Sequence, residues 1–199
     1  MKKLIVLFFV AIMSLSTSAA FAAENTKGNM NVDQLKQEKT EIDKLEKDIA
    51  KIESVSPDEL ESFYEENKEW IADVNDRLDA HMASVPEDEK EAELLNLRDG
   101  DNQFSTMAVS SKYFNDHYFH KRNGMWTYSM WPKTSTRLLR SYASAGWTEL
   151  TNYYSNIDTN SLEDQYWCHF EAFIESDWDI EQGRPDVGLI KTIAALCNP

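Results

Sequence analysis

The sequence lacks the short motifs that identify common classes of enzyme. It contains no nucleophile elbow, no phosphate-binding loop, no two-histidine zinc helix and no calcium-binding loop. Beyond its first two dozen residues it also has no apolar run near the ~20 residues that a membrane-spanning helix needs. Any site must therefore be assembled from scattered polar residues, and no motif gives a reason to expect a metal ion or another cofactor.

Positive charge is scarce as well. The chain has 20 lysines and arginines against 35 aspartates and glutamates, which gives a formal net charge of −15. This charge repels nucleic-acid phosphates and anionic lipid headgroups, so we expect neither nucleic acid nor membrane as a partner of the mature protein. It keeps the protein soluble and could attract a basic protein.

Cysteine is limited to Cys168 and Cys197. In an oxidising compartment an even pair predicts a disulfide, and a bridge across this loop would add roughly 3 kcal/mol in the chain-entropy model. Two free thiols and a two-cysteine metal site are the alternatives. A metal site would need further ligands, and only His169 lies close in the sequence, so the disulfide is favoured.

The N-terminus has the three parts of a secretory signal. Lys2 and Lys3 precede an apolar run over residues 4–15 and a small-residue stretch that ends Ala20-Phe21-Ala22. Small side chains three positions and one position before the cut fit signal peptidase, which predicts cleavage between Ala22 and Ala23. We therefore expect an exported, extracellular protein of bacterial type.

Composition divides the mature chain near Gly100. Residues 24–101 hold 24 acidic and 10 basic side chains, whereas residues 102–199 hold 11 acidic and 8 basic ones. Five of the six tryptophans lie in the second part. The sequence thus predicts a signal peptide over 1–22, an acidic helical region over 23–101 and a compact aromatic domain over 102–199.

The acidic region is expected to be helical throughout. An apolar stripe at heptad spacing predicts a first helix, Ser56-Pro57-Asp58-Glu59 predicts a capping box that starts a second, and Pro86 opens a third that ends near Gly100. The apolar positions are Leu35, Ile42, Leu45, Ile49, Ile52, Leu60, Phe63, Tyr64, Ile71, Val74, Leu78, Leu94, Leu95 and Leu97. The stripes are narrow, which favours a hairpin, a loose bundle or a coiled coil that serves as a spacer. A homodimer through this region is one option.

The aromatic domain is expected to open with a β-hairpin. Asn123-Gly124 is a strong signal for a two-residue turn, because both positions tolerate positive φ. Pairing outward from the turn gives the cross-strand pairs Lys121–Trp126, Phe119–Tyr128 and His117–Met130. That face is aromatic and is expected to be buried, and the face that carries Thr127 and Ser129 is expected to lie nearer to solvent.

Helices are expected to follow the hairpin. Residues 134–145 and 147–154 predict two of them, separated by Gly146. Residues 161–174 fit a helix capped by Ser161 better than a strand. Residues 178–185 are expected to be extended or looped, and residues 187–196 predict a short final helix. The expected fold class is α+β.

Several uncommon residue combinations occur in order along the second half. They are Gly124-Met125-Trp126, Thr136-Arg137, Gly146-Trp147-Thr148-Glu149-Leu150, Asp164-Gln165, Cys168-His169, Arg184-Pro185 and Cys197-Asn198-Pro199. With these residues, roughly the last ninety positions resemble a domain of unknown function found in secreted proteins of Gram-positive bacteria. The resemblance implies secretion and a single globular domain, and it implies no activity.

His169 is the best candidate for a catalytic residue. On a helix it lies one turn from Gln165, and a positioned histidine can act as a general base near neutral pH. Glu149 could supply a carboxylate, and Arg137 or Arg184 could bind an anion. The simpler interpretation is a histidine that is hydrogen-bonded in a small core, with the arginines in structural ion pairs.

Three classes of function remain. The first is an extracellular binding or interaction module, with an unidentified protein or a cell-envelope component as its ligand. The second is a small secreted hydrolase or toxin that uses His169 with a carboxylate and an arginine, and the third is a structural component of the envelope or matrix. Binding ranks first because the acid–base signal is weak and no catalytic motif is present.

Overall fold

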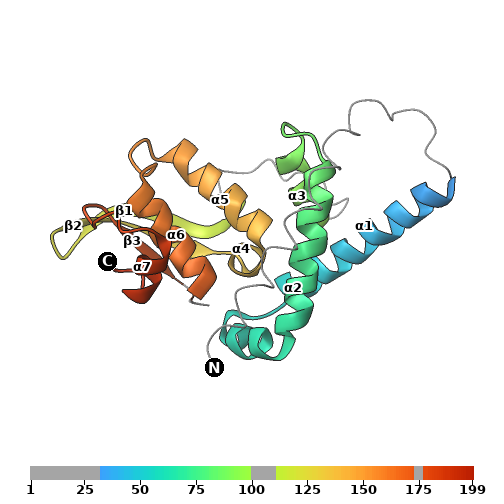
Figure 1. Ribbon diagram of the computed structural model, residues 1–199, viewed down its shortest axis with the longest axis horizontal. Helices are drawn as coiled ribbons and strands as arrows, with labels where there is room; N and C mark the ends of the chain where they lie inside the picture. The colour runs from blue at the N-terminus through green and yellow to red at the C-terminus, as the bar shows by residue number, and fades with distance from the viewer. Residues whose placement is uncertain (1–31, 100–110, 173–176) are drawn as a thin grey trace, which may run out of the picture. The chain divides into compact units, whose positions relative to one another are not determined.

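The computed structural model describes residues 32–99, 111–172 and 177–199 (Figure 1). The chain divides into two compact units, Met1–Glu41 and Ile42–Pro199. The cleavage site between Ala22 and Ala23 lies outside the described residues. The described part of the first unit is the beginning of a helix, in which the Thr40 hydroxyl donates to the Lys36 carbonyl.

Helices make up the acidic half, as expected. α1 (Val32–Glu53) is followed by the 3-10 turn η1 (Pro57–Glu59), by α2 (Leu60–Ser84) and by α3 (Lys90–Asp99). Apolar side chains spaced three and four residues apart give each helix a buried stripe. The buried members in the second unit are Leu45, Ile49, Ile52, Leu60, Ile71, Val74, Leu78, Met82, Leu94, Leu95 and Leu97.

The start of the second helix differs from the predicted capping box. Ser56 is the N-cap and Pro57 takes the first position, as predicted. The Ser56 hydroxyl, however, donates to the Glu59 carboxylate at 3.1 Å and does not cap a backbone amide. The amide of Glu59 already donates to the Ser56 carbonyl in the 3-10 turn, so it is not available to the hydroxyl.

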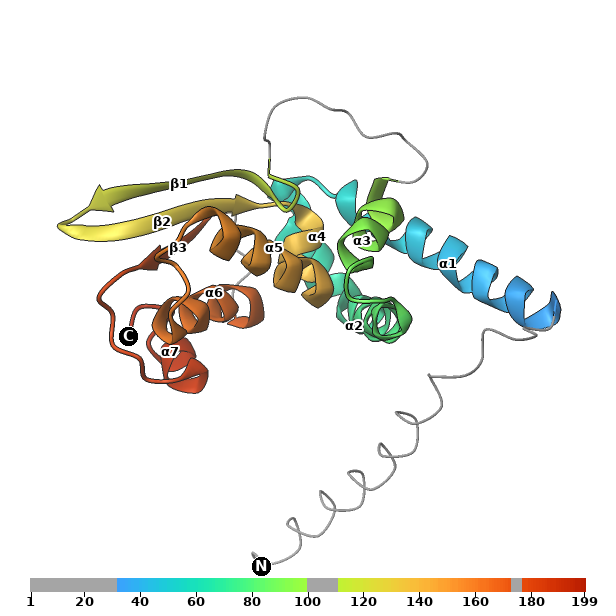
Figure 2. The same ribbon diagram turned by 90° about the horizontal axis from the view of Figure 1, so that it is seen from above.

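The sheet has three antiparallel strands in the order β1 (Phe114–Arg122), β2 (Met125–Pro132) and β3 (Trp178–Glu181). The predicted pairing is confirmed, with Lys121 opposite Trp126, Phe119 opposite Tyr128 and His117 opposite Met130. Both turn residues have positive φ, as this kind of turn requires. Figure 2 shows β1 as the outermost strand on one side, with β3 on the other.

The two helices after the hairpin break at a different place from the one expected. α4 (Thr134–Leu138) ends at Leu139, and α5 (Arg140–Tyr153) runs through Gly146 without interruption. A Cβ at Gly146 would lie 3.1 Å from both Phe114 Cζ and Tyr166 Oη. This glycine therefore permits close packing of the helix on its neighbours and does not end it.

The segment that could have been strand or helix is a helix, α6 (Asn160–Ala172). Residues 173 and 174 lie outside the described part of the chain. The predicted cap is wrong by two positions: Thr159 Oγ1 accepts from the amide of Leu162 at 3.4 Å. The Ser161 hydroxyl instead donates to the Arg184 carbonyl at 2.9 Å and so holds the loop after β3 against the helix.

The C-terminal segment is tied to α6 by a disulfide. Cys168 of α6 bonds to Cys197, with Cα atoms 5.5 Å apart, which confirms the predicted pairing against free thiols or a metal site. Between them the chain forms a short helix, α7 (Leu189–Ala194). Both half-cystines are buried.

Helices and sheet share one hydrophobic core in the second unit. Asn75 of α2 donates to the Leu138 carbonyl at 2.9 Å and accepts from the Arg140 amide at 2.8 Å, which satisfies the backbone at the α4–α5 break. Tyr142 of α5 donates to the Leu94 carbonyl of α3 at 2.6 Å. The fold class is α+β, as predicted. The predicted domain boundary lies in residues 100–110, outside the described residues, and stays a prediction.

None of the described helices is both long and apolar enough to cross a membrane.

Candidate functional site

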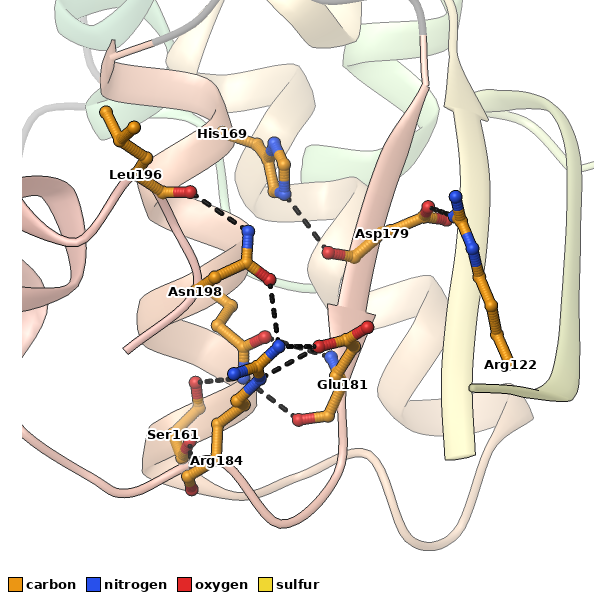
Figure 3. Close-up of polar contacts among 9 residues, drawn as sticks. Arg122, Ser161, His169, Asp179, Glu181, Arg184, Leu196 and Asn198 are labelled. Carbon is orange, nitrogen blue, oxygen red and sulfur yellow. Dashed lines mark hydrogen bonds and ion pairs between the residues drawn. The ribbon is translucent and has the colours of Figure 1, made fainter. Parts of the chain in front are cut away.

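Two predicted site residues, Gln165 and His169, lie one turn apart on α6 and face the outer edge of β3. The Gln165 amide donates to the Glu181 carbonyl at 3.1 Å and accepts from the Glu181 amide at 2.9 Å. His169 Nε2 lies 3.2 Å from the Asp179 carbonyl. Figure 3 shows this contact between α6 and β3. These two side chains occupy the positions that a neighbouring strand would fill. The helix thereby closes this edge of the sheet.

Arg184 is the third predicted residue at this edge. Its Nε donates to the Glu181 carboxylate at 2.8 Å, its Nη2 donates to the same oxygen, and Asn198 accepts from Nη2 at 3.4 Å (Figure 3). Because Asn198 follows Cys197, this hydrogen bond from Arg184 links the C-terminus to the loop after β3, beside the disulfide. Arg184 thus forms a structural ion pair, and its partner is Glu181.

A shallow cavity of about 430 Å³ opens beside Arg184. It is lined by Asn156, Thr159, Asn160, Ser161, Leu162, Gln182, Gly183, Arg184 and Asp186, and more of its lining surface is apolar than polar. The described lining contains one arginine and one carboxylate but not His169. The convergence of histidine, carboxylate and arginine that would favour a hydrolase is therefore not found in this cavity.

The other two predicted residues lie elsewhere. Glu149 of α5 accepts from the Ser111 hydroxyl and from the Lys112 amide at 3.0 Å, so it fixes the start of the hairpin segment. Arg137 of α4 is buried, and that burial lowers its pKa, with the charge of Asp177 acting in the opposite direction. A catalytic role for the five predicted residues stays a prediction.

A polar group that sequence reasoning missed lies on the sheet itself. Asp179 of β3 accepts from the Ser129 hydroxyl of β2 and forms an ion pair with Arg122 of β1. The sequence feature that could have revealed Asp179 is the alternation Trp178-Asp179-Ile180-Glu181, which is typical of a strand. In that strand the apolar residues are buried and the carboxylates lie on the opposite face.

The aromatic face of the hairpin is only partly buried, which corrects the expectation. Tyr128 and Met130 are buried because β2 is the central strand and this face pairs with Ile180 and Trp178 of β3. Nearer the turn, Phe119 and Trp126 are 38% and 47% exposed. The opposite face is corrected as well, since Thr127 and Ser129 are buried at the centre of the sheet.

The exposed rings of Phe119, Trp126 and Tyr153 form, with the buried Tyr128 and the partly buried His117 and Tyr154, a continuous group that we call the aromatic surface. Phe119 stacks between Trp126 and Tyr128, with ring centroids 4.8 and 4.4 Å away, and Lys121 Nζ lies 5.9 Å from the Trp126 ring. The group is Phe119, Trp126, Tyr128, Tyr153, Tyr154 and His117.

His117 joins this surface to α5. Its Nδ1 lies 2.8 Å from the Tyr154 hydroxyl, and its ring contacts that of Tyr153 edge to face at 5.0 Å. Burial, followed by neighbouring charges, raises the pKa of Tyr154 to about 12, so the phenol stays protonated and able to donate at neutral pH. These contacts give His117 a structural role between the hairpin and α5. Tyr153 is 62% exposed at the end of the surface.

Residues 115–199 match the family model described as Protein of unknown function (DUF2599). The matched region contains the hairpin, α6 and the disulfide, and it agrees with the resemblance to a domain of unknown function. Among the curated proteins and among the solved structures, nothing matches the chain. Within residues 32–99, 111–172 and 177–199, no three His, Cys, Asp or Glu side chains gather where they could hold a metal ion.

Proposed function

We propose that the protein is a secreted binding module that contacts its ligand through the aromatic surface of the hairpin. The observation that carries the proposal is the exposure of Trp126 and Phe119 on the hairpin and of Tyr153 at the end of α5, which belong to one group of contacting rings. Clustered exposed aromatic rings are typical of binding sites, since each ring buries a large area at a small cost in side-chain entropy.

Charge supports the same surface. The hairpin, residues 114–132, carries Lys121 and Arg122 against the carboxylate of Asp116, and Arg122 also pairs with Asp179 of β3, within a chain whose formal net charge is −15. An anionic ligand would be repelled less by this neutral-to-basic hairpin than by the acidic remainder of the protein. A cell-envelope component or a protein with an acidic face would fit.

The alternatives are not favoured by the described residues. A hydrolase would use His169, whose imidazole is buried against the backbone of β3. A purely structural component would not need the exposed rings of Trp126 and Tyr153.

The test measures binding of the secreted protein to cell envelopes isolated from the producing bacterium, by co-sedimentation and by Trp fluorescence. Trp126→Ser should weaken binding at least tenfold, which corresponds to about 1.4 kcal/mol for one aromatic contact residue. Ile190→Ser, at an apolar residue that is 85% exposed on α7, is the matched control and should bind as the wild type does. Equal binding by both variants would rule out the aromatic surface.

A further inference from the structure

The two edge strands of the sheet, β1 and β3, differ in what satisfies their outward-facing backbone groups. The outer edge of β3 is closed by Gln165 and His169 of α6. The outer edge of β1 pairs with no strand in the described part of the chain, although β1 is the longest strand there, with nine residues. An open edge of this length is a template for another strand.

The hairpin register shows which backbone groups of β1 point outward. Arg122 and Met125 flank a two-residue turn, so they form a hydrogen-bonded pair, and the next pair, Lys121–Trp126, does not. The Trp126 carbonyl accepts from Gln182 instead, on the far side from β1. By alternation, the amides and carbonyls of Lys121, Phe119 and His117 point away from β2. The amide of His117 accordingly donates to the carboxylate of Asp116.

The middle of this edge lacks the features that usually prevent pairing. Soluble proteins protect open edges with proline, with lysine or with a bulge. β1 has a bulge between Phe114 and Asp116 and a lysine at position 121, but residues 117–120 are His-Tyr-Phe-His. Tyr118 and Phe119 are 44% and 38% exposed there, on opposite faces of the strand.

We propose that the partner of this edge is a second copy of the same chain, paired antiparallel about a twofold axis at Phe119. The register then sets Phe119 opposite Phe119, His117 opposite Lys121, Tyr118 opposite His120 and Asp116 opposite Arg122. The axis passes through a residue whose amide and carbonyl both point outward, so the two Phe119 residues exchange both backbone hydrogen bonds. The twofold symmetry makes the contact closed and self-complementary.

Charge selects this register. Asp116 and Arg122 lie six positions apart on the strand, so a twofold axis at Phe119 sets them face to face, and it does so twice. Arg122 already pairs with Asp179 through Nη1, but its side chain is 56% exposed and its guanidinium has further donors for the Asp116 carboxylate of the other copy. A parallel, in-register pairing would place Asp116 beside Asp116 and Arg122 beside Arg122, and like charges directly opposite are destabilising. The antiparallel pairing also joins the aromatic surfaces of the two copies at Phe119.

The test uses cysteine cross-linking, because the register makes it specific to position. Residues of a hydrogen-bonded antiparallel pair have Cα atoms about 5.5 Å apart, within the range of a disulfide. Phe119→Cys should therefore give a covalent dimer under mild oxidation. Lys121→Cys is the matched control, because its counterpart in the other copy is His117, and it should stay monomeric on a non-reducing gel.

Sedimentation equilibrium of the full secreted protein supplies the second measurement. Phe119→Pro removes an amide that only the dimer uses, so it should weaken dimerisation at least tenfold while circular dichroism and the Cys168–Cys197 bridge stay native. Trp126→Ser removes the proposed ligand contact and should leave the dimer intact, so the two proposals fail separately. A monomeric wild type would overturn the inference. So would equal cross-linking by both cysteine variants, or a dimer that persists in Phe119→Pro, as one formed through the helical region would.

Discussion

Replacing Gln165 with methionine tests whether α6 closes the edge of β3. The Gln165 side chain is fully buried and makes three hydrogen bonds, to the Ser161 carbonyl at 3.1 Å and to the amide and carbonyl of Glu181 at 2.9 and 3.1 Å. Methionine has a similar length and is also unbranched, so the substitution removes the hydrogen bonds with little change in volume. The Ser161 carbonyl lies within the helix, where it can keep a backbone partner, so only the Glu181 groups are lost.

The magnitude follows from those two groups. A buried backbone amide or carbonyl left without a partner costs about 1–3 kcal/mol, so losing both partners of Glu181 should cost roughly 2–6 kcal/mol in the free energy of unfolding. Small domains have only about 5–15 kcal/mol in total, so the variant should be folded but clearly weakened.

Urea unfolding measures the loss in the free energy of unfolding, and amide hydrogen exchange shows which backbone amides lose protection. The Glu181 amide should lose its protection, while amides in the β1–β2 ladder should exchange at a rate set by the global loss alone. Gln182→Met, at the next residue, is the control. The side-chain amide of Gln182 donates to the Tyr128 hydroxyl at 3.0 Å in a partly exposed position, where water can replace the lost hydrogen bond. A Gln165→Met variant that loses less than about 1 kcal/mol, or that keeps its Glu181 amide protected, would refute the edge-closing role.

Three further predictions concern the disulfide, pH and the domain boundary. Cys197→Ser should lower the free energy of unfolding by roughly 2–5 kcal/mol, measured by urea unfolding without reductant, and an unchanged midpoint would contradict this. Burial first, and then the charge of Asp186, raise the pKa of Asp164 above its usual 3.8, so the folded state holds that proton more tightly and stability falls as pH rises through this range. Asp164→Asn should therefore raise the thermal midpoint at pH 7 and leave it unchanged near pH 3, and an equal shift at both would point to another cause. Limited proteolysis is expected to cut first within residues 99–106, and first cuts inside α2 would contradict the predicted boundary.

Sequence periodicity predicted most of the elements, because the features concerned are local. The apolar spacing of α1, α2 and α3, and the turn at Asn123-Gly124 with the register that follows from it, depend on residues close together in the chain. The disulfide was predictable for another reason, since two cysteines allow only one intramolecular pairing.

The features that were predicted wrongly depend on what packs against each element. Gly146 looks like a helix break in the sequence, but the rings of Phe114 and Tyr166 require its small size inside α5. Which face of the hairpin is exposed depends on the neighbouring strand and helices, so alternation alone assigned Trp126 to the core and Thr127 to the surface. Asp179 could be noticed only once residues 178–181 were seen as a strand.

The placement of His169 shows why a catalytic histidine and a structural one look alike in sequence. Both kinds are flanked by polar residues at helical spacing, and here Gln165 supplies that pattern because α6 must satisfy the backbone of β3 at two successive outward-facing positions, Asp179 and Glu181. The spacing of four residues on the helix brings two side chains to one face, and the spacing of two on the strand brings the groups they bind to one edge. An unprotected edge would offer the same groups to another chain. Gln165 and His169 thus explain why the outer edge of β3 is closed. Beside β1, the described residues provide no such pair, so we expect binding at the hairpin side of the sheet.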